Sequence, residues 1–280
     1  MKRIWYSLCK QKSGLVGIII ILLLIFAAVF APLLTSADPN KIVLTDRLLP
    51  PGSTSDTGYH LCGTDSLGRD VFARLLYGSR VSLLTGFCAA AISVCLGTFL
   101  GLISGYFGGW FDIILMRLAD IQLAFPFTLL ALTFIATLGG GLVQLILIMG
   151  IFRWVNFARI TRAEVLSLRE REFVQAARAI GFGNLHIMLK HVLPNVIAPI
   201  IVSASFVIAS NILSETTLSF LGLGVEASIP TWGSLLAEGR DLLTEAWWIA
   251  TLPGLTVMVT VLGVNLFGDW LRDFLDPKMQ

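Results

Sequence analysis

An uncharged apolar run over residues 15–34 leaves few folds open to this chain. An α-helix rises about 1.5 Å per residue, so about 20 residues cross a hydrocarbon core of roughly 30 Å. Four cations and no acid precede the run. A secretory signal peptide would have a shorter apolar core, about 7–15 residues, followed by a small-residue cleavage site. Because the run is longer and Pro32 follows the best cleavage candidate, we expect a retained membrane helix.

Further apolar segments follow along the chain. They lie near residues 81–104, 112–137, 142–160, 195–214 and 248–268. Pro126, Arg153 and Pro199 interrupt three of them, and neighbouring helices of a bundle can satisfy the backbone groups that such breaks free. Only 14% of the residues are charged, against about 25% in soluble domains. We therefore expect an all-α polytopic membrane protein with about six transmembrane helices.

The distribution of charge predicts which side of the membrane each loop faces. With the N-terminus inside, the cytoplasmic segments carry 13 cationic residues, Arg153 among them, and 6 acidic residues, a net charge of +7. The outer segments carry 6 cationic and 10 acidic residues, Glu215 among the acids, a net charge of −4. Because cytoplasmic loops are enriched in Lys and Arg, both termini are predicted to be cytoplasmic.

This topology divides the chain into segments of different character. The prediction is a cytoplasmic N-terminus (1–14), a first transmembrane helix (15–34), an extracytoplasmic loop (35–80), a membrane core (81–270) that contains a cytoplasmic loop (161–194), and a cytoplasmic C-terminus (271–280).

Patterns that would indicate catalysis are missing from the sequence. It contains no GxxxxGK[ST], HExxH or GxSxG pattern and no CxxC pair. Asp112 and Asp120 are about 12 Å apart along one helix, too far to share a proton. His60 and Cys62, with Asp65 nearby, fit a hydrogen-bonded loop histidine better than a metal site. We expect no enzyme activity, no metal and no cofactor, and the net charge of +2 favours no nucleic acid.

The inner loop carries helical patterning. Ser167 and Glu170 fit a capping box that would begin a helix over residues 168–180. Gly181 stands where a glycine ends a helix in the left-handed conformation. A second short helix is predicted from Asn184 up to Pro194, which would stop it.

One face of the first of these helices is apolar and rich in alanine. It comprises Phe173, Ala176, Ala177 and Ile180, which recur at helical spacing. The ridge could enter a groove on another protein, or it could pack on the membrane domain of this chain. The residues alone leave both alternatives open.

Several segments resemble one family of membrane transport proteins. QAARAIG at residues 175–181, then nine residues, then HVLP at 191–194 resembles the EAA loop of ABC-importer permeases. Further matching segments lie at 60–83, 116–131, 218–224, 230–233 and 265–277. Together they resemble the dipeptide/oligopeptide/nickel permease family, in particular its second, C-type subunit.

The resemblance implies a fold and a set of partners. It implies the transmembrane fold of a type I ABC importer in a bacterial or archaeal cytoplasmic membrane. Two permeases would form a heterodimeric pore, two ATPases would bind below it, and an extracytoplasmic binding protein would deliver the solute. Gln175, Ala176, Ala177, Gly181 and Pro194 would couple the permease to the ATPases. Gln175 replaces the family's usual Glu, so an acidic contact to the ATPase is not expected there.

Small residues recur every four positions in the second apolar segment. They are Ala89, Ser93, Gly97, Gly101 and Gly105. Such spacing allows helices to approach closely in lipid. The glycines could pack against helices of this chain or against a second permease, and the first alternative is the more common.

The third apolar segment is the candidate wall of a solute path. Arg117 and Asp120 are three residues apart and could pair on one helix face. Ionisable groups are costly in a membrane and persist where they face a partner or a wet path. Pro126 cannot donate to the carbonyl of Gln122, which favours a kink. A pathway role and a purely structural ion pair both remain open.

Two turns stand out in the outer loop. Gly63-Thr64-Asp65 and Gly68-Arg69-Asp70 fit turns in which Asp side chains accept backbone N–H groups. The loop could meet a binding protein, or it could close over the outer ends of the helices.

These observations favour a permease subunit without catalysis of its own, driven by partner ATPases and taking up small peptides. A nickel or metal-chelate permease of the same family is the first alternative. An ion-coupled secondary transporter is the second, but the inverted repeats typical of that class are not evident.

Overall fold

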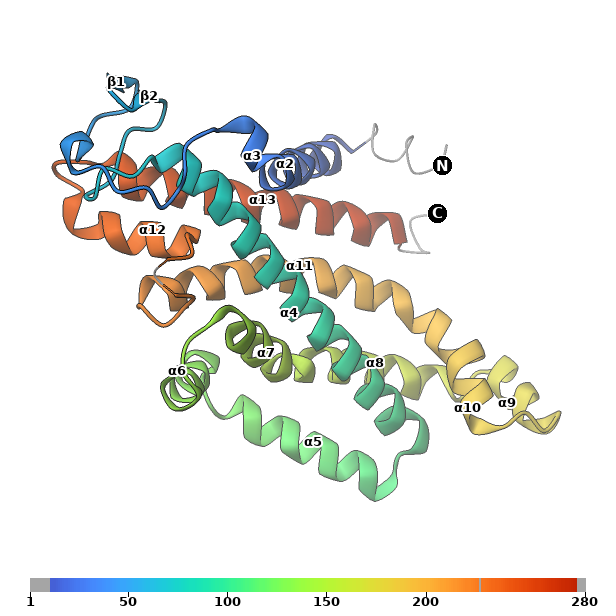
Figure 1. Ribbon diagram of the computed structural model, residues 1–280. Coiled ribbons are helices and arrows are strands. Elements are labelled where there is room, and N and C mark those ends of the chain that lie inside the picture. The colour runs from blue at the N-terminus through green and yellow to red at the C-terminus, as the bar shows by residue number, and fades with distance from the viewer. Residues whose placement is uncertain (1–10, 227, 276–280) are drawn as a thin grey trace.

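The structure is a computed structural model that describes residues 11–226 and 228–275. The predicted termini, 1–14 and 271–280, therefore lie largely outside the described residues. Helices account for most of the chain, and one short hairpin lies at one end (Figure 1). Five helical segments are long and apolar enough to cross a membrane, or six if a bent pair forms one span. The expectation of an all-α polytopic protein with about six spans is thus confirmed.

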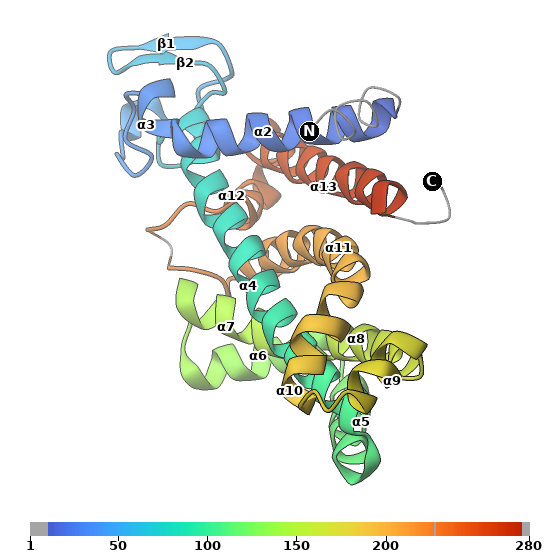
Figure 2. The same cartoon turned by 90° about the vertical axis from the view of Figure 1, so that its right-hand side faces the viewer.

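Long helices form the body of the molecule. They are α2 (Lys12–Val29), α4 (Val71–Phe107), α5 (Gly109–Leu123), α6 (Phe127–Leu138), α7 (Leu142–Phe152), α8 (Trp154–Leu168), α11 (Leu193–Phe220) and α13 (Trp248–Leu275). Helix α4 runs diagonally through the molecule, between the α2/α13 pair and the α5–α8 group (Figures 1 and 2). Buried residues of α4, α8 and α11 share one apolar cluster, so these three helices form the centre of the fold.

The glycine face of α4 lies against α8 of the same chain. A Cβ added to Gly97 would meet the Trp154 carbonyl oxygen at 2.3 Å, and one added to Gly101 would meet the Ala158 carbonyl oxygen at 2.4 Å. At Gly105 the nearest atom would be the Val165 Cβ, at 2.8 Å. The small residues therefore serve close packing within this chain along α8.

The first helix packs at the edge of the bundle. Helix α2 lies beside α13 (Figures 1 and 2), and Gly17 of α2 approaches the backbone of Phe267 and Gly263 in α13. The other face of α2 is exposed and apolar, as expected of a helix that meets lipid.

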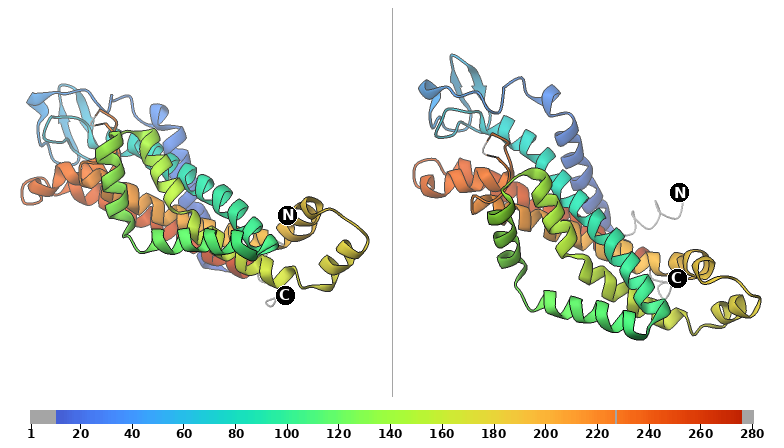
Figure 3. Two further views of the ribbon diagram at one scale, coloured as in Figure 1. Left: turned by 90° about the horizontal axis from the view of Figure 1, so that it is seen from below. Right: turned by 60° about the horizontal axis from the view of Figure 1, so that its bottom comes forward.

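The two ends of the molecule carry different structures (Figure 3). At one end lie α3 (Ala31–Leu34), a 3₁₀ turn (Leu44–Asp46), the hairpin β1 (Ser53–Ser55) and β2 (Gly58–His60), α12 (Trp232–Gly239) and a 3₁₀ turn (Arg240–Leu242). In the antiparallel hairpin, Ser53 pairs with His60. At the opposite end α9 (Glu172–Ala179), α10 (Asn184–Ile187) and a π segment (Met188–Val192) project from the bundle. After the topology that the sequence predicts, the first end is called the outer end and the second the inner end.

Several predicted boundaries were wrong. Helix α4 begins at Val71, ten residues before the predicted span. The Asp70 side chain caps it by accepting the Ala73 N–H, and polar side chains of its first turns, such as Arg74, are buried at the outer end. The outer loop therefore ends at residue 70 rather than 80. The predicted third span is two helices, α5 and α6, bent by 86°. Helix α8 continues to Leu168, which shortens the predicted inner loop.

Candidate functional site

The inner protrusion ends α9 with a glycine, as its sequence predicts. Gly181 has φ of +91°. The Gly181 N–H donates to the Arg178 carbonyl, and the Phe182 N–H donates to the Ala177 carbonyl. This pair of hydrogen bonds is the Schellman arrangement, which requires a left-handed residue at the position of Gly181.

The predicted start of this helix was wrong. Ser167 lies inside α8, and α9 begins only at Glu172 after Arg171, whose side chain makes no capping hydrogen bond. The capping-box pattern fails here because packing against the glycines of α4 keeps the chain helical through Leu168. Residues 169–171 then form the turn between α8 and α9.

Pro194 does not stop the second helix, as the sequence had indicated. It is the second residue of α11, but the helix runs into it without a break from the preceding π segment. The preceding π segment, Met188–Val192, bonds the Leu193 N–H to the Met188 carbonyl. The wider π turn relieves the clash between a proline ring and the carbonyl four residues earlier. Residues Asn184–Phe220 consequently form one continuous helix of 37 residues.

The predicted apolar ridge is divided between two faces. Ala177 is buried, together with Val174, against α4 and α11. Ala176 is exposed, and so are the large apolar side chains of the protrusion. These are Phe173, Ile180, Phe182, Leu185 and Leu189, between 43% and 75% exposed. A cluster of exposed apolar side chains on a polar protrusion marks a surface for a partner.

Polar contacts fix this protrusion to the base of α4. The Tyr106 hydroxyl donates to Asn184 Oδ1 at 3.0 Å, and the Arg178 guanidinium lies 5.1 Å from the centre of the Tyr106 ring. His186 stacks on Phe182 with ring centres 4.6 Å apart. Gln175, which is exposed, donates only to the Glu170 carbonyl. The apolar surface is therefore presented from a rigid support, with the Gln175 amide beside it.

Two helix breaks meet inside the bundle. The chain turns between α5 and α6 at residues 124–126, where Pro126 precedes α6. It breaks again at Arg153, between α7 and α8. Gln122 joins the two breaks, because its Nε2 donates to the Phe152 carbonyl and its Oε1 accepts the Trp154 indole N–H at 2.8 Å. Discontinuous helices that meet at membrane depth are a common setting for solute sites.

Arg153 lies at this junction. Its two terminal nitrogens donate to Ser210 Oγ and Ser214 Oγ of α11, each at 2.6 Å. Its guanidinium lies 4.9 Å from the centre of the Phe127 ring. In the described part of the chain no carboxylate lies within salt-bridge distance of it, and its Nε has no hydrogen-bond partner. A cation at this depth costs roughly 2.5–3.5 kcal/mol on insertion scales, so the position calls for a functional explanation.

The predicted pairing of Arg117 with Asp120 was wrong. Asp120 pairs with Arg159 of α8, and the Arg117 side chain is exposed on α5. Asp112 pairs with Arg162, also of α8, whose second nitrogen donates at 2.6 Å. Helix α8 thus offers a cation at two places along α5, which the local spacing of Arg117 and Asp120 could not reveal.

The outer end is closed by buried charges from distant parts of the chain. Asp65 accepts from Arg69 at 2.7 Å and from Arg74 at 2.6 Å. Both arginines also contact Glu238 of α12, at 2.8 and 2.9 Å. The Trp248 indole donates to the Thr64 carbonyl at 3.0 Å. The loop therefore packs on the outer ends of α4, α12 and α13.

The two predicted Asp turns are present in this outer region. Asp65 Oδ1 accepts the N–H groups of Leu67 and Arg69, and Asp70 caps α4. His60 is buried and bonded to Asp70 at 2.8 Å, with Ser55 beside its other nitrogen at 3.1 Å. Cys62 and Asp65, the neighbours considered for a metal site, are not its partners.

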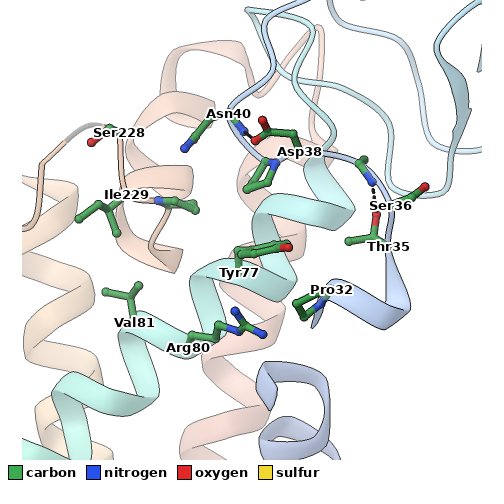
Figure 4. A pocket seen from close by; sticks show the side chains of 13 residues that line it. Pro32, Thr35, Ser36, Asp38, Asn40, Tyr77, Arg80, Val81, Ser228 and Ile229 are labelled. Atoms are coloured by element: carbon green, nitrogen blue, oxygen red, sulfur yellow. Dashed lines mark hydrogen bonds between the residues drawn. The ribbon is translucent and has the colours of Figure 1, made fainter. Parts of the chain in front are cut away.

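A recess of about 590 Å³ lies where the first span leaves the bundle (Figure 4). Tyr77 and Arg80 of α4 line it opposite Asp38 and Pro32. Arg80 is turned onto the last carbonyls of α2, those of Ala28 and Val29. It therefore holds the end of α2 against α4, and the recess belongs to the outer end rather than to the helix breaks.

These features define the class of protein. Broken helices around a partly buried arginine, with an exposed apolar protrusion at one end, are features found in membrane transport subunits. Residues 97–280 match the model of the binding-protein-dependent transport system inner membrane component. Residues 1–51 match the N-terminal transmembrane domain of oligopeptide transport permease C. The chain belongs to this family of transport permeases, as its sequence motifs indicated.

Curated relatives cover nearly the whole chain. A dipeptide transport system permease of Alkalihalophilus pseudofirmus is 45% identical over 98% of this chain and 88% of its own length. A di/tripeptide transport system permease of Pseudomonas aeruginosa is 43% identical over 100% and 93%. A probable D,D-dipeptide transport system permease of Escherichia coli is 41% identical over 93% and 86%.

Sequence reasoning missed the residues that only tertiary structure brings together. Arg153 was counted with the cytoplasmic cations, although a charge within an apolar segment was itself a signal of a buried site. Glu215 was counted with the outer loops, but it is buried in α11 and accepts from Ser82 and Ser219. Glu238 gave no signal, because its partners precede it by more than 160 residues.

Proposed function

We propose that this chain is one permease of an ATP-driven importer that takes up small peptides. Membership of the family makes it an inner membrane component of a binding-protein-dependent transport system, which supports a subunit without catalysis of its own. The relatives above are named for transport of dipeptides and tripeptides, which favours peptides over metal chelates.

The observation that carries this proposal is the rigid apolar surface on α9 and α10. Val174 and Ala177 pack on helices of this chain, but Ile180 and Leu185, 75% and 68% exposed, are left available to a partner. Apolar groups held rigidly are well suited to enter a groove of a partner, because little conformational freedom is lost on binding. We assign this surface, with Gln175, Ala176 and Gly181, to contact with an ATPase, one for each of two permeases.

The proposed orientation places the protrusion in the cytoplasm. When Arg153 and Glu215, which lie within the helical bundle, are left out of the count, 12 cations stand against 6 acids inside and 6 against 9 outside. The inner segments still carry the excess of positive charge. The outer end, with residues 35–70, then faces the binding protein.

Labelling of the outer end tests the topology. A cysteine placed at Asp56, an exposed residue of the outer end, should react with an impermeant reagent added to intact cells. Reaction only after permeabilisation would refute the orientation.

Reconstitution tests the function itself. The chain with its second permease, two ATPases and binding protein should accumulate a dipeptide in proteoliposomes when ATP is supplied. The chain alone should neither bind nor hydrolyse ATP, because it lacks a phosphate-binding loop. Robust hydrolysis by the isolated chain, or a complete importer that ignores peptides, would contradict the proposal.

A further inference from the structure

Arg153 differs from the other inner-half cations in having no acidic partner. Arg159 pairs with Asp120, and Arg162 pairs with Asp112. Within residues 11–226 and 228–275, Arg153 contacts only two serine hydroxyls and an aromatic face. Its counter-charge must therefore come from outside the described residues.

Arg153 lies well inside a segment that is long enough to cross a membrane. It stands about 17 Å along the helix from Leu142, the first residue of this 27-residue segment. A hydrocarbon core of about 30 Å, set anywhere along a segment of about 40 Å, includes Arg153.

The surroundings are suited to a polar ligand rather than to lipid. Three parts of the chain surround the guanidinium. They are the start of α6 at Phe127, the break between α7 and α8 at Arg153 itself, and α11 with the two serines. Gln122 fixes both helix breaks from α5. The Arg153 Nε is a buried donor with no acceptor in the described structure. The site therefore offers one positive charge and at least one unused N–H.

We propose that Arg153 binds the α-carboxylate of the peptide as it crosses the membrane. This inference rests on the proposed function, because every linear peptide ends in a carboxylate. A planar guanidinium matches a carboxylate with two parallel hydrogen bonds. Ser210 and Ser214 hold the guanidinium when no solute is present.

Cysteine labelling in the assembled importer tests this proposal. The chain, with Cys9, Cys62, Cys88 and Cys95 replaced by Ser, carries Arg153→Cys and is reconstituted with both ATPases, the second permease and the binding protein. Water-soluble thiol reagents should react at position 153. In a separate variant, Ser214→Cys, which keeps Arg153, delivery of a dipeptide during ATP turnover should slow labelling at position 214 at least fivefold. Leu22→Cys on the lipid-facing side of α2, where Leu22 is 59% exposed, should stay unreactive.

The charge of the reagent identifies the role of Arg153. Uptake by the Arg153→Cys importer should fall at least tenfold, and an ammonium-bearing reagent should bring it to within threefold of the parent. Sulfonate-bearing or methyl reagents should not restore it. Arg153→Lys should keep at least a third of uptake. Arg153→Gln can still donate to the serines, but its uptake should fall at least tenfold. If Arg153 were only a structural hydrogen-bond donor, Gln would replace it and uptake would be retained.

The outcomes separate this proposal from the proposed function. Absence of any reaction at position 153, labelling that the peptide does not slow, or equal rescue by neutral and cationic reagents would overturn the role of Arg153. Loss of uptake without protection would indicate instead an acidic partner on the second permease. The protection measurement uses Ser214→Cys because this variant keeps the guanidinium, so it does not depend on whether Arg153→Cys assembles. Absence of peptide uptake by the unsubstituted importer would refute the proposed function instead.

Discussion

The two ends of this molecule use their side chains in opposite ways. At the outer end, Asp65, Arg69, Arg74 and Glu238 are turned inward and joined to one another. At the inner end, the large apolar side chains of α9 and α10 are turned outward, and Tyr106 and Asn184 hold them in place. The charged groups of the outer end are thus paired within this chain, whereas the inner end leaves large apolar side chains exposed.

The largest expected effect comes from breaking the outer network. Arg74→Met leaves Asp65 and Glu238 with one arginine fewer in a site where the Arg74 side chain is only 1% exposed. Loss of one partner from a buried ion network costs about 3–5 kcal/mol. Because Arg69 still contacts both acids, we expect the free energy of unfolding to fall by about 3 kcal/mol. The change is measured as a lower midpoint of thermal unfolding, followed by tryptophan fluorescence in nanodiscs.

The matched control for that variant is Arg240→Met. Arg240 pairs with Asp241 at 3.0 Å, but both side chains are mostly exposed. Such pairs contribute little to stability, so the unfolding midpoint should stay where it is. Equal shifts for the two variants would show that the outer network is not a closed structural unit.

Gly181→Val should affect coupling rather than stability of the membrane domain. The φ of +91° costs a β-branched residue more than about 1 kcal/mol, although the space around it is open. The chain after α9 should therefore turn away and displace the apolar surface. We expect uptake and solute-stimulated ATP hydrolysis to fall together at least tenfold, with less ATPase in copurification.

Gly183 provides the control for the inner end. It has φ of −67° and ψ of 153°, a conformation that valine adopts readily, and it also faces open space. Gly183→Val should therefore retain uptake within about twofold. If Gly181→Val also retained normal uptake and ATPase copurification, the protrusion would not be the coupling element.

A smaller effect is expected from pH at the outer end. Hydrogen bonds from the Thr57 and Ser55 hydroxyls lower the pKa of Asp46 below its ordinary value of 3.8. A lowered pKa in the folded state contributes stability that is present at neutral pH and is lost as the pH falls below about 4. The unfolding midpoint should therefore drop less between pH 5 and pH 3 in Asp46→Asn than in the parent chain. Identical pH profiles would exclude a contribution from Asp46.

The smallest effect is expected at Gln175. This exposed residue donates only to the Glu170 carbonyl. Gln175→Glu, which introduces the family's usual residue, should leave uptake and ATPase copurification within twofold of the parent. A large gain in copurification would show that the acidic contact is missing from this chain, and a large loss would show that the amide itself is read by the partner.

The same contrast explains how far sequence alone could go. Uncharged runs located the helices because the free energy of placing a side chain in lipid depends mainly on that residue itself. Gly181 was predictable because its conformation follows from local chemistry. The false capping box at Ser167 and the false pairing of Arg117 with Asp120 both failed for one reason: the competing partner, α4 in one case and Arg159 in the other, lies far along the chain.

The continuity of α10, the π segment and α11 has a mechanical consequence. A helix of 37 residues is about 55 Å long, so a tilt of about 5° at the inner end displaces the outer end by about 5 Å. Ser210 and Ser214 ride on this rod, whereas Arg153 is anchored on a different one. A displacement of the inner end would therefore move the Ser210 and Ser214 hydroxyls relative to the Arg153 guanidinium. Movement at the protrusion would in this way change the hydrogen bonds of that guanidinium.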